Sequence, residues 1–549
     1  MLIKGGKIMK KIKLLISSFL SLSMLISISG IKPVSAQAAT TTDFLKTSGQ
    51  VIKNNNGTGN VVQLKGTNLG GYLLQEDWMS PLGATDDYTA RTTLINRFGV
   101  DATDSLFSDY ENDWITDSDF DNIESYGLNM VRLPIYWENV MNRDGSIKNN
   151  AWAKIDWVVN ECAARNIYVL LDLHGVPGGD DGWQSGGVSK NELWSNPTYQ
   201  AWTVNLWKAM AAHYKGNPTI CGYDLLNEPV STSSTVTNSA FYNTLYQAVR
   251  SVDPDHIIFV EAFYDFNYIA PPSTYGWSNV VYETHNYDMD ESSDGNKQLA
   301  FAYSQLSMLA KYKSQLNVPI YSGEYCFYDF NNVWNVWLSG LDSMGISWSN
   351  WAYKVKQNYG NWGFFNTDSN PSPDLNNDSQ DTILSKWSKF TTNNFKPNTG
   401  FQNLIKGYTG TTIPNPSGTS YIRAVANSQI ISNDTTGTNP LAASKSAVGG
   451  AWESYRIINN ADGTMSFQSM ANNLYVCADS NQSNKLVARS TSISTWEKFQ
   501  KVDLGDGTIA LKAMTNNKYV TCDLNNGATL YANKDSVGGA WEVFYITPQ

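Results

Sequence analysis

The regular alternation of two patterns between residues 60 and 353 constrains the fold more than any other feature. Short runs rich in β-branched residues alternate there with longer stretches of helical periodicity, as in repeated βα units. Eight such units predict an α/β fold, a (β/α)8 or TIM barrel. The competing fold is a doubly wound open sheet, but no G-x-G-x-x-G loop follows the first expected strand. The expected strands are Val62–Asn68, Met130–Ile135, Tyr168–His174, Gly222–Asn227, Ile257–Glu261, Val280–His285, Pro319–Glu324 and Ile346–Asn350, and the clearest helices are Ala151–Asn166, Pro197–Tyr214 and Ser239–Val252.

The chain changes character past residue 370. Loops rich in Asn, Asp, Ser and Pro are followed, from Tyr408, by a stretch rich in Thr, Gly and Pro that is typical of a linker. We therefore expect a barrel domain over residues 39–405, a linker over 406–417 and a second domain over 418–549.

The second domain contains an internal repeat. Its Trp-Glu pairs begin at Trp452, Trp496 and Trp541, at spacings of 44 and 45 residues. Three copies of a strand-rich unit predict an all-β domain, a β-trefoil. The Trp-Glu-x-Phe/Tyr pattern resembles fascin-like and ricin-like trefoils, which implies a domain that binds sugars or other proteins; we favour a carbohydrate-binding domain. The repeated tryptophan is expected to be a core residue rather than a ligand platform.

The N-terminal segment has the pattern of a secretory signal peptide. Lys10, Lys11 and Lys13 precede an apolar run from Leu14 to Ile28, and small residues follow it. We expect a signal peptide over residues 1–38 and a secreted, extracellular protein. A membrane anchor is the alternative, but the apolar run is short and is interrupted by serines.

Charge and cysteine usage exclude several classes of function. A formal net charge of −11 argues against nucleic acid or anionic lipid as a partner and fits a neutral substrate. The five cysteines are scattered and odd in number, which does not suggest a disulfide framework or a zinc site. Aromatic residues make up 13% of the chain, a composition that fits either sugar-stacking platforms or an aromatic core.

Two glutamates lie where expected strands end. Glu228 belongs to an Asn-Glu-Pro sequence after an apolar strand, and Glu324 ends another strand three βα units further along. The carboxyl ends of TIM-barrel strands form the catalytic face. Glycosidic bond cleavage needs such a carboxyl pair, one to protonate the leaving oxygen and one to attack or stabilise the anomeric carbon. Taken alone, Asn-Glu-Pro fits a helix N-cap equally well.

Other polar and aromatic residues are expected on the same face: Arg132, His174, His285, Tyr287 and Trp351. Each of these alone is more often structural than catalytic, so the hypothesis rests on their convergence. Neither an HExxH motif nor a G-x-S-x-G elbow occurs in the sequence. We therefore expect no metal and no cofactor.

This set of motifs, in this order over residues 60–400, resembles glycoside hydrolase family 5, a group of barrel glycosidases. The resemblance implies that Glu228 is the acid/base and Glu324 the nucleophile of a retaining mechanism. It also implies that Asn227 binds the sugar 2-hydroxyl and that Arg132 and Tyr287 orient Glu324. The residues that it assigns to the −1 sugar subsite are Arg132, His174, Asn227, His285, Tyr287 and Trp351.

Within the family, the sequence around Asn68–Pro81 looks most like exo-β-1,3-glucanases, which implies that Glu76 contacts the terminal glucose. Tyr72 stands where that group commonly has Trp, and the loop after His174 differs. We expect a secreted, retaining glucan 1,3-β-glucosidase that is monomeric and acts on β-glucan. Alternatives are an endo-acting β-1,4- or β-1,6-glucanase, or an inactive polysaccharide-binding or adhesion protein.

Overall fold

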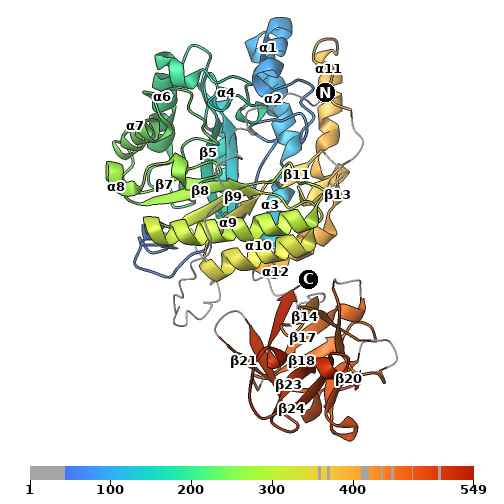
Figure 1. Cartoon of the computed structure of the whole chain (residues 1–549). Coiled ribbons are helices and arrows are strands. Elements are labelled where there is room, and N and C mark those ends of the chain that lie inside the picture. The colour runs from blue at the N-terminus through green and yellow to red at the C-terminus, as the bar shows by residue number, and fades with distance from the viewer. Residues whose placement is uncertain are drawn as a thin grey trace. The chain divides into compact units, whose positions relative to one another are not determined.

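The computed structural model describes two folded regions, a barrel and an all-β C-terminal domain (Figure 1). The described residues are 44–356, 360–367, 371–409, 419–433, 437–446, 451–460, 462–472, 474–504 and 508–548. The expected signal peptide, residues 1–38, lies outside them. In the part that is described, no helix is long and apolar enough to cross a membrane.

The barrel is a closed ring of parallel strands in the order β10-β3-β4-β5-β6-β7-β8-β9. This confirms the predicted TIM barrel, and each expected strand is present with a shift of a few residues at its ends. The largest shifts are of three residues, because β3 begins at Lys65 rather than at Val62 and β6 ends at Asp224 rather than at Asn227. The strands are β3 Lys65–Asn68, β4 Met130–Tyr136, β5 Tyr168–Gly175, β6 Ile220–Asp224, β7 Ile257–Glu261, β8 Val280–Asn286, β9 Ile320–Tyr325 and β10 Ser347–Asn350.

The inward face of the barrel changes from apolar to polar along β5 and β7. In β5, Tyr168 and Leu170 belong to a buried apolar cluster inside the barrel, while the next two residues of the same alternation are Asp172 and His174. β7 behaves similarly, because its inward residues run from Ile257 through Phe259 to a final acid. Polar groups are thereby concentrated at the carboxyl ends of the strands.

Helices surround the ring of strands, as Figure 1 shows. Local sequence accounts for where several of them begin. Asn196 caps α6 by accepting the backbone N–H groups of Thr198 and Tyr199, and Pro197 occupies the first turn, where its missing N–H costs nothing. The helices are α1 Asp87–Phe98, α2 Val100–Trp114, α3 Asp117–Ser125, α4 Trp137–Val140, α5 Ala153–Ala164, α6 Pro197–Tyr214, α7 Asn238–Arg250, α8 Pro272–Tyr275, α9 Gly295–Leu316, α10 Asn331–Met344, α11 Gln380–Trp387 and α12 Thr399–Thr409.

Two small sheets complete the barrel region. The hairpin β1 Lys46–Ser48 and β2 Val51–Lys53 contributes Leu45 and Ile52 to the apolar cluster at the amino ends of the strands, so this end of the barrel is closed. The second sheet pairs β11 Lys354–Val355, β12 Phe365–Asn366 and β13 Lys396–Pro397. α12 continues to Thr409, four residues into the predicted linker, and the remaining linker, residues 410–417, is outside the described residues.

The C-terminal domain is all-β, as predicted. Six strands pair in a circuit, because β14 pairs with β17 and β25, β18 with β17 and β21, and β22 with β21 and β25. The other six form the hairpins β15–β16, β19–β20 and β23–β24. These pairings support a trefoil, which stays a prediction. The strands are β14 Thr419–Ala424, β15 Ile430–Ser432, β16 Ala442–Lys445, β17 Tyr455–Asn459, β18 Met465–Ser469, β19 Tyr475–Asp479, β20 Lys485–Ser490, β21 Phe499–Asp503, β22 Ile509–Ala513, β23 Lys518–Asp523, β24 Thr529–Lys534 and β25 Phe544–Pro548.

The repeated Trp-Glu pair corrects one expectation. The glutamates are buried, whereas Trp452 is 47% exposed and the tryptophans of the other repeats are partly exposed. Each buried glutamate accepts a hydrogen bond from a hydroxyl, as Glu542 does from Thr521 at 2.7 Å. The prediction of a core tryptophan was wrong, because the short 3-10 helix that holds the pair turns the glutamate inward and the indole toward solvent.

Candidate active site

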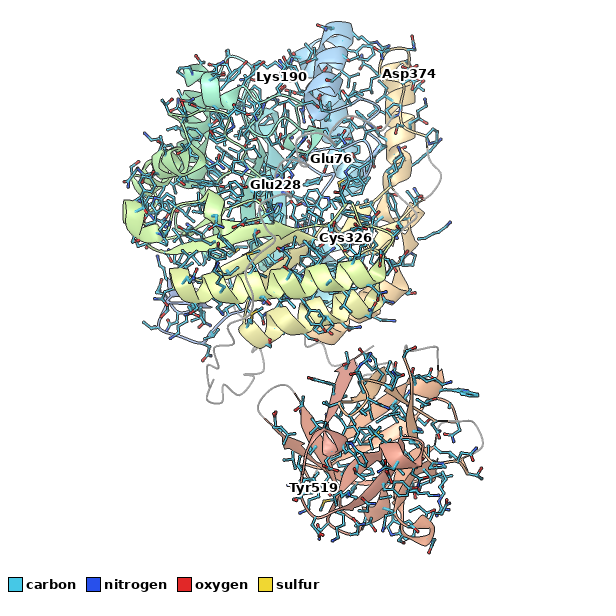
Figure 2. The ribbon with its side chains drawn as sticks, in the orientation of Figure 1. Glu76, Lys190, Glu228, Cys326, Asp374 and Tyr519 are labelled. Atoms are coloured by element: carbon cyan, nitrogen blue, oxygen red, sulfur yellow. The ribbon has the colours of Figure 1, made fainter. Side chains whose placement is uncertain are left out.

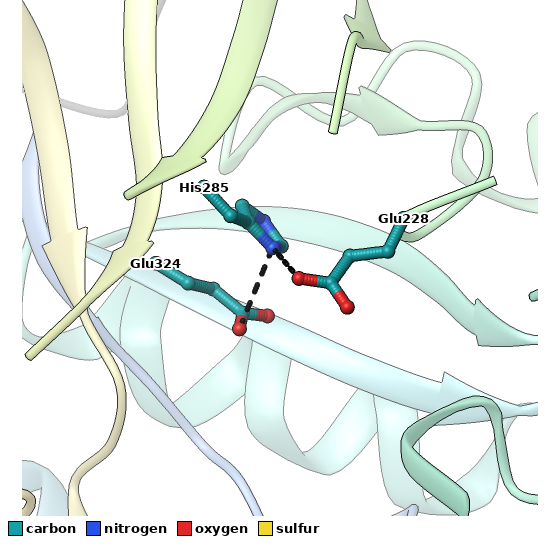
Figure 3. A group of neighbouring side chains, drawn as sticks. All are labelled: Glu228, His285 and Glu324. Carbon is teal, nitrogen blue, oxygen red and sulfur yellow. Dashed lines mark hydrogen bonds and ion pairs between the residues drawn. The ribbon is translucent and has the colours of Figure 1, made fainter. Parts of the chain in front are cut away.

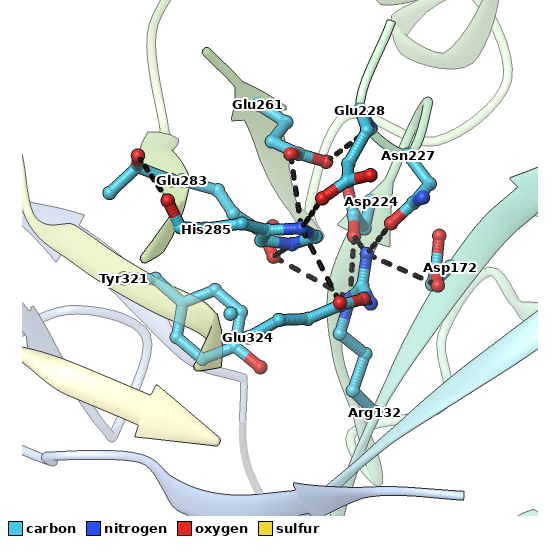
Figure 4. A network of polar contacts seen from close by, with 12 residues as sticks. Arg132, Asp172, Asp224, Asn227, Glu228, Glu261, Glu283, His285, Tyr321 and Glu324 are labelled. Atoms are coloured by element: carbon cyan, nitrogen blue, oxygen red, sulfur yellow. Dashed lines mark hydrogen bonds and ion pairs between the residues drawn. The ribbon is translucent and has the colours of Figure 1, made fainter. Parts of the chain in front are cut away.

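Arg132 lies at the centre of the polar end of the barrel (Figure 4). The side chain is fully buried in β4, and its guanidinium donates to carboxylates from three different elements. Nη1 lies 2.7 Å from Glu324 Oε1, Nη2 lies 2.8 Å from Asp224 Oδ2, and Nη2 lies 3.2 Å from Asp172 Oδ2. A planar guanidinium with five donors can bridge several acids at fixed angles, which a lysine cannot do.

Glu324 sits near the end of β9 and is held by two donors. Arg132 Nη1 donates to Oε1, and the Tyr287 hydroxyl donates to Oε2 at 3.0 Å. The preceding residue, Gly323, leaves room for an acid of the neighbouring strand, since a Cβ there would lie 1.8 Å from Glu283 Oε1. These contacts fix the orientation of the Glu324 carboxylate before any ligand binds.

Glu228 is positioned by a loop rather than by a strand. It lies four residues past β6 and has a positive φ of 45°, a backbone conformation that residues other than glycine rarely adopt. Its backbone N–H donates to Glu261 Oε2 at 2.8 Å, and its carboxylate Oε1 lies 2.8 Å from His285 Nδ1. No helix begins here, because α7 starts at Asn238, so the helix-cap interpretation of Asn-Glu-Pro is wrong.

The two glutamates have different surroundings although they lie close together (Figure 3). A carboxylate oxygen of Glu228 lies within 4.8 Å of one of Glu324. Arg132 contacts Glu324 directly, while the partner of the Glu228 carboxylate is His285, whose pKa burial lowers to about 3. Burial raises the pKa of Glu228 to about 7. Near neutral pH this carboxyl can therefore hold a proton beside a neutral imidazole.

Two sets of donors in this region have spacings that could hold a metal ion, Glu228, His285 and Glu324 in one set and Glu261, Glu283 and His285 in the other. In the first set the atoms that would bind the metal already make hydrogen bonds within the protein. His285 Nδ1 bonds Glu228, and both oxygens of Glu324 accept hydrogen bonds. Both sets share the same histidine, so they describe one hydrogen-bonded network.

Three more predicted residues line the same site. Asn227 Oδ1 accepts Arg132 Nη2 at 2.9 Å, and its buried Nδ2 has no hydrogen-bond partner within the described part of the chain. That amide is free to donate to a ligand. The rings of His174 and Trp351 stack with centroids 5.2 Å apart, and His174 Nδ1 lies 2.6 Å from Asp172 Oδ2.

Glu76 approaches from the loop after β3 rather than from a strand end; it is labelled with Glu228 in Figure 2. Trp78 Nε1 donates to Glu76 Oε2 at 2.9 Å. Burial raises the pKa of Glu76 to about 8, and the charges of Glu324 and Glu228 add to the shift. The structure thus brings Glu76 into electrostatic contact with the glutamate pair, together with the other predicted residues: Arg132, His174, Asn227, His285, Tyr287 and Trp351.

Sequence reasoning missed four buried acids around Arg132 and His285. Burial raises the pKa of Asp172 and of Asp224 to about 7, and it also raises the pKa values of Glu261 and Glu283. A signal for them was present, because each is an acid that follows a run of mostly apolar residues within its strand. The four are Asp172, Asp224, Glu261 and Glu283.

A row of aromatic rings near this site also escaped prediction. Trp183 and Phe263 have ring centroids 5.7 Å apart, Phe263 and Tyr264 4.6 Å, and Tyr264 and Tyr268 5.4 Å. Trp183, Tyr264 and Tyr268 are each about half exposed, at 49%, 49% and 52%. The row begins beside the acids, since the Phe263 carbonyl accepts the backbone N–H of His285 at 2.7 Å.

Comparison with known proteins agrees with this geometry. Residues 86–357 match the family described as cellulase (glycosyl hydrolase family 5), a match that includes both Glu228 and Glu324. Over these residues the barrel resembles glycosyl hydrolase family 5. This confirms the family resemblance of the barrel that its motifs suggested.

Individual relatives match only part of the chain. A beta-xylosidase from Phanerodontia chrysosporium is 32% identical over 254 residues, which is 45% of this chain and 52% of that protein. A probable glucan 1,3-beta-glucosidase A from Aspergillus clavatus is 28% identical over 243 residues, 42% of this chain and 57% of that protein. The chain thus spans about half the length of these curated relatives. The crystal structure of rutinosidase from Aspergillus niger aligns with a TM-score of 0.42 and 19% identity, over 53% of this chain and 90% of that one.

Proposed function

We propose that this protein is a retaining β-glycoside hydrolase that acts on β-glucan, as a glucan 1,3-β-glucosidase. The observation that carries the proposal is the carboxyl pair, with oxygens within 4.8 Å and two different surroundings. Retaining glycosidases hold their carboxyl groups about 5–5.5 Å apart, whereas inverting enzymes leave roughly 6.5–9.5 Å for a water molecule. The names of the glucan 1,3-beta-glucosidase relatives support the substrate class.

In the first step Glu324 attacks the anomeric carbon and Glu228 gives its proton to the departing oxygen. The bond from the anomeric carbon to that oxygen breaks, and a glycosyl ester with Glu324 forms. Arg132 and Tyr287 hold the attacking carboxylate in line. The pKa of Glu228, about 7, leaves this acid protonated below neutral pH, as the step requires.

In the second step Glu228, now ionised, takes a proton from a water molecule. The resulting hydroxide attacks the anomeric carbon, the ester to Glu324 breaks, and the sugar leaves with its original configuration. Asn227 Nδ2 is placed to donate to the sugar 2-hydroxyl, a contact that strengthens in the transition state.

The exposed aromatic row supports a polymeric substrate. Sugar rings stack on exposed aromatic faces, and this row starts next to the His285–Glu228 pair, where the leaving group departs. Trp183→Ala should therefore raise KM for glucan chains several-fold while aryl β-glucoside hydrolysis stays near wild type. Equal KM values for Trp183→Ala and wild type on glucan chains would remove this support.

The direct test is a hydrolysis panel of laminarin, pustulan, lichenan, cellulose and mannan with product analysis. We expect glucose, released with retained configuration, from laminarin. Oligosaccharides from cellulose or pustulan would instead favour an endo-acting β-1,4- or β-1,6-glucanase. No reducing sugar from any of these substrates, or from an aryl glycoside, would favour a polysaccharide-binding protein without activity.

A β-xyloside is the second candidate substrate, because the relative with 32% identity is named a beta-xylosidase. Xylose lacks the hydroxymethyl group of glucose, so the two substrates are discriminated by the walls of the −1 subsite. A ratio of kcat/KM for aryl β-glucoside over aryl β-xyloside below one would favour this candidate.

The C-terminal domain, on this proposal, tethers the enzyme to insoluble glucan and so raises the effective substrate concentration. The partly exposed Trp452, Trp496 and Trp541 supply one stacking surface in each repeat. Secretion and a monomeric state belong to the same proposal. Secretion rests on the sequence of residues 1–38.

A further inference from the structure

Glu261 touches the Glu228 loop from the neighbouring strand β7. Its carboxylate Oε2 accepts the backbone N–H of Glu228 at 2.8 Å, and its Oε1 lies 3.5 Å from His285 Nδ1. The same His285 nitrogen lies 2.8 Å from Glu228 Oε1. One buried carboxyl therefore contacts both the backbone of Glu228 and the ring that holds the Glu228 side chain (Figure 4).

The backbone of Glu228 needs such a support. A φ of 45° is costly for a residue with a side chain, and it persists only where surrounding contacts hold it. The N–H that Glu261 accepts belongs to this same residue, so losing the acceptor would release the peptide and tilt the carboxyl. Glu261 is itself held at the end of β7, where its own N–H donates to the Tyr242 hydroxyl at 3.1 Å.

We propose that Glu261 is a positioning residue for the acid/base Glu228, holding its backbone and the His285 ring so that the proton is aimed at the leaving oxygen. The inference rests on the proposed glycosidase function. Glu261 does not reach the substrate; it acts through Glu228 and His285. Its loss should therefore damage proton donation and spare the attack by Glu324.

Leaving groups separate these two effects. A 2,4-dinitrophenyl group departs without a proton, while a phenyl group or a sugar needs one. Glu261→Met fills similar space but offers no acceptor, and Glu261→Gln keeps a carbonyl oxygen for the Glu228 N–H. Tyr223→Phe is the matched control, because it removes a buried polar group of β6 that bonds Asp253 and touches neither glutamate.

In Glu261→Met we expect kcat/KM, which reports the first step, to fall on the order of 10²-fold for phenyl β-glucoside and laminaribiose, the scale of a misplaced catalytic group. For 2,4-dinitrophenyl β-glucoside kcat/KM should fall about 3-fold or less, because this leaving group needs no proton. Glu261→Gln should restore most of the loss, and Tyr223→Phe should leave the ratio between substrates unchanged. Equal losses on both substrates in Glu261→Met, or the selective loss persisting in Glu261→Gln, would overturn the proposal.

Failure of the proposed function gives a different result, because wild type would then hydrolyse none of these glucosides. If wild type is active and Glu228→Gln shows the leaving-group dependence while Glu261→Met does not, only the role of Glu261 is wrong. Should Glu261→Met fail to fold, the comparison of Glu261→Gln with wild type decides: unchanged leaving-group dependence supports the acceptor role, and selective loss contradicts it.

Discussion

The barrel and the C-terminal domain both bury glutamates, but in opposite ways. In the C-terminal domain Glu453, Glu497 and Glu542 occur once in each repeat, and each accepts a hydroxyl hydrogen bond. In the barrel the buried acids do not recur in a sequence repeat. Among the described residues, both carboxylate oxygens of Glu283 lack a hydrogen-bond partner, as does one oxygen of Glu261. Acids that recur in each repeat and have hydrogen-bond partners stabilise a fold. A crowded set of acids that recurs in no repeat and lacks some of these partners marks a functional site, where the free energy of unfolding is lower than it would be without them.

The largest test of this difference is Glu324→Gln. Loss of the nucleophile removes the covalent route, so kcat should fall by more than about 10⁴-fold, beyond the usual contribution of a general acid or base. Oligosaccharide binding and the thermal unfolding midpoint should change little. Turnover and binding by calorimetry are the measurements, and an unaffected rate would contradict the assignment.

The next test is the pH profile. Glu228 must be protonated for the first step, and its pKa in the fold is raised to about 7, so kcat/KM should be high below pH 7 and fall about tenfold per pH unit above it. Wild type should show this basic limb on phenyl β-glucoside, whose leaving group needs the proton, and Glu228→Gln should show no such limb on 2,4-dinitrophenyl β-glucoside, which it can still cleave. A limb that stays at the same pH in Glu228→Gln would assign the titration to another group.

Stability should respond to pH through Glu76. Its pKa is raised in the fold from 4.5 to about 8, so the folded state binds the proton more tightly and loses stability as pH rises through this window. Glu76→Gln should therefore raise the unfolding midpoint at pH 9 by roughly 2 °C or more relative to wild type, with a smaller gain at pH 4. A midpoint difference that does not depend on pH would contradict this reasoning.

In the C-terminal domain we expect effects on stability instead of catalysis. Glu542→Ala leaves the Thr521 hydroxyl and the Gly538 N–H without their acceptor, at a cost of about 1–3 kcal/mol in the unfolding of this domain. Hydrolysis of aryl β-glucosides by the barrel should be unchanged. Glu453→Ala and Glu497→Ala, measured by denaturant unfolding, should cost similar amounts if the repeats are equivalent.

The smallest expected effect on folding comes from Trp452→Ala. The exposed indole contributes little to the core, so the free energy of unfolding should change by about 0.5 kcal/mol or less. Retention on insoluble glucan in a pull-down assay should nevertheless decrease. Unchanged retention in a variant that lacks Trp452, Trp496 and Trp541 would remove carbohydrate binding from this domain.

Much of the site could be predicted because many of its polar residues lie in or directly after strands that the sequence pattern identifies. His174, His285 and Glu324 fall within the carboxyl halves of strands that apolar periodicity identifies, and Arg132 is the third residue of β4; the barrel then brings these strands together. The four acids that were missed also lie in these strands. They were overlooked because alternation alone does not reveal which face of a barrel strand points inward.

Other features needed the folded chain. The position of Glu228 depends on a loop with a positive φ and on the Glu261 carboxylate 33 residues away in sequence. The exposure of Trp452 depends on how a short 3-10 helix directs two adjacent side chains, and the identity of a Trp-Glu pair does not determine that direction.

The sequence by itself determined the order of the strands, the residues at their ends and the threefold repeat, because periodicity and turn chemistry are local properties of the chain. Only the tertiary structure decided which buried acids meet around Arg132 and His285 and how near the two glutamates lie. The electric field at a carboxyl depends on groups contributed by distant strands, so its protonation is decided only when the barrel closes.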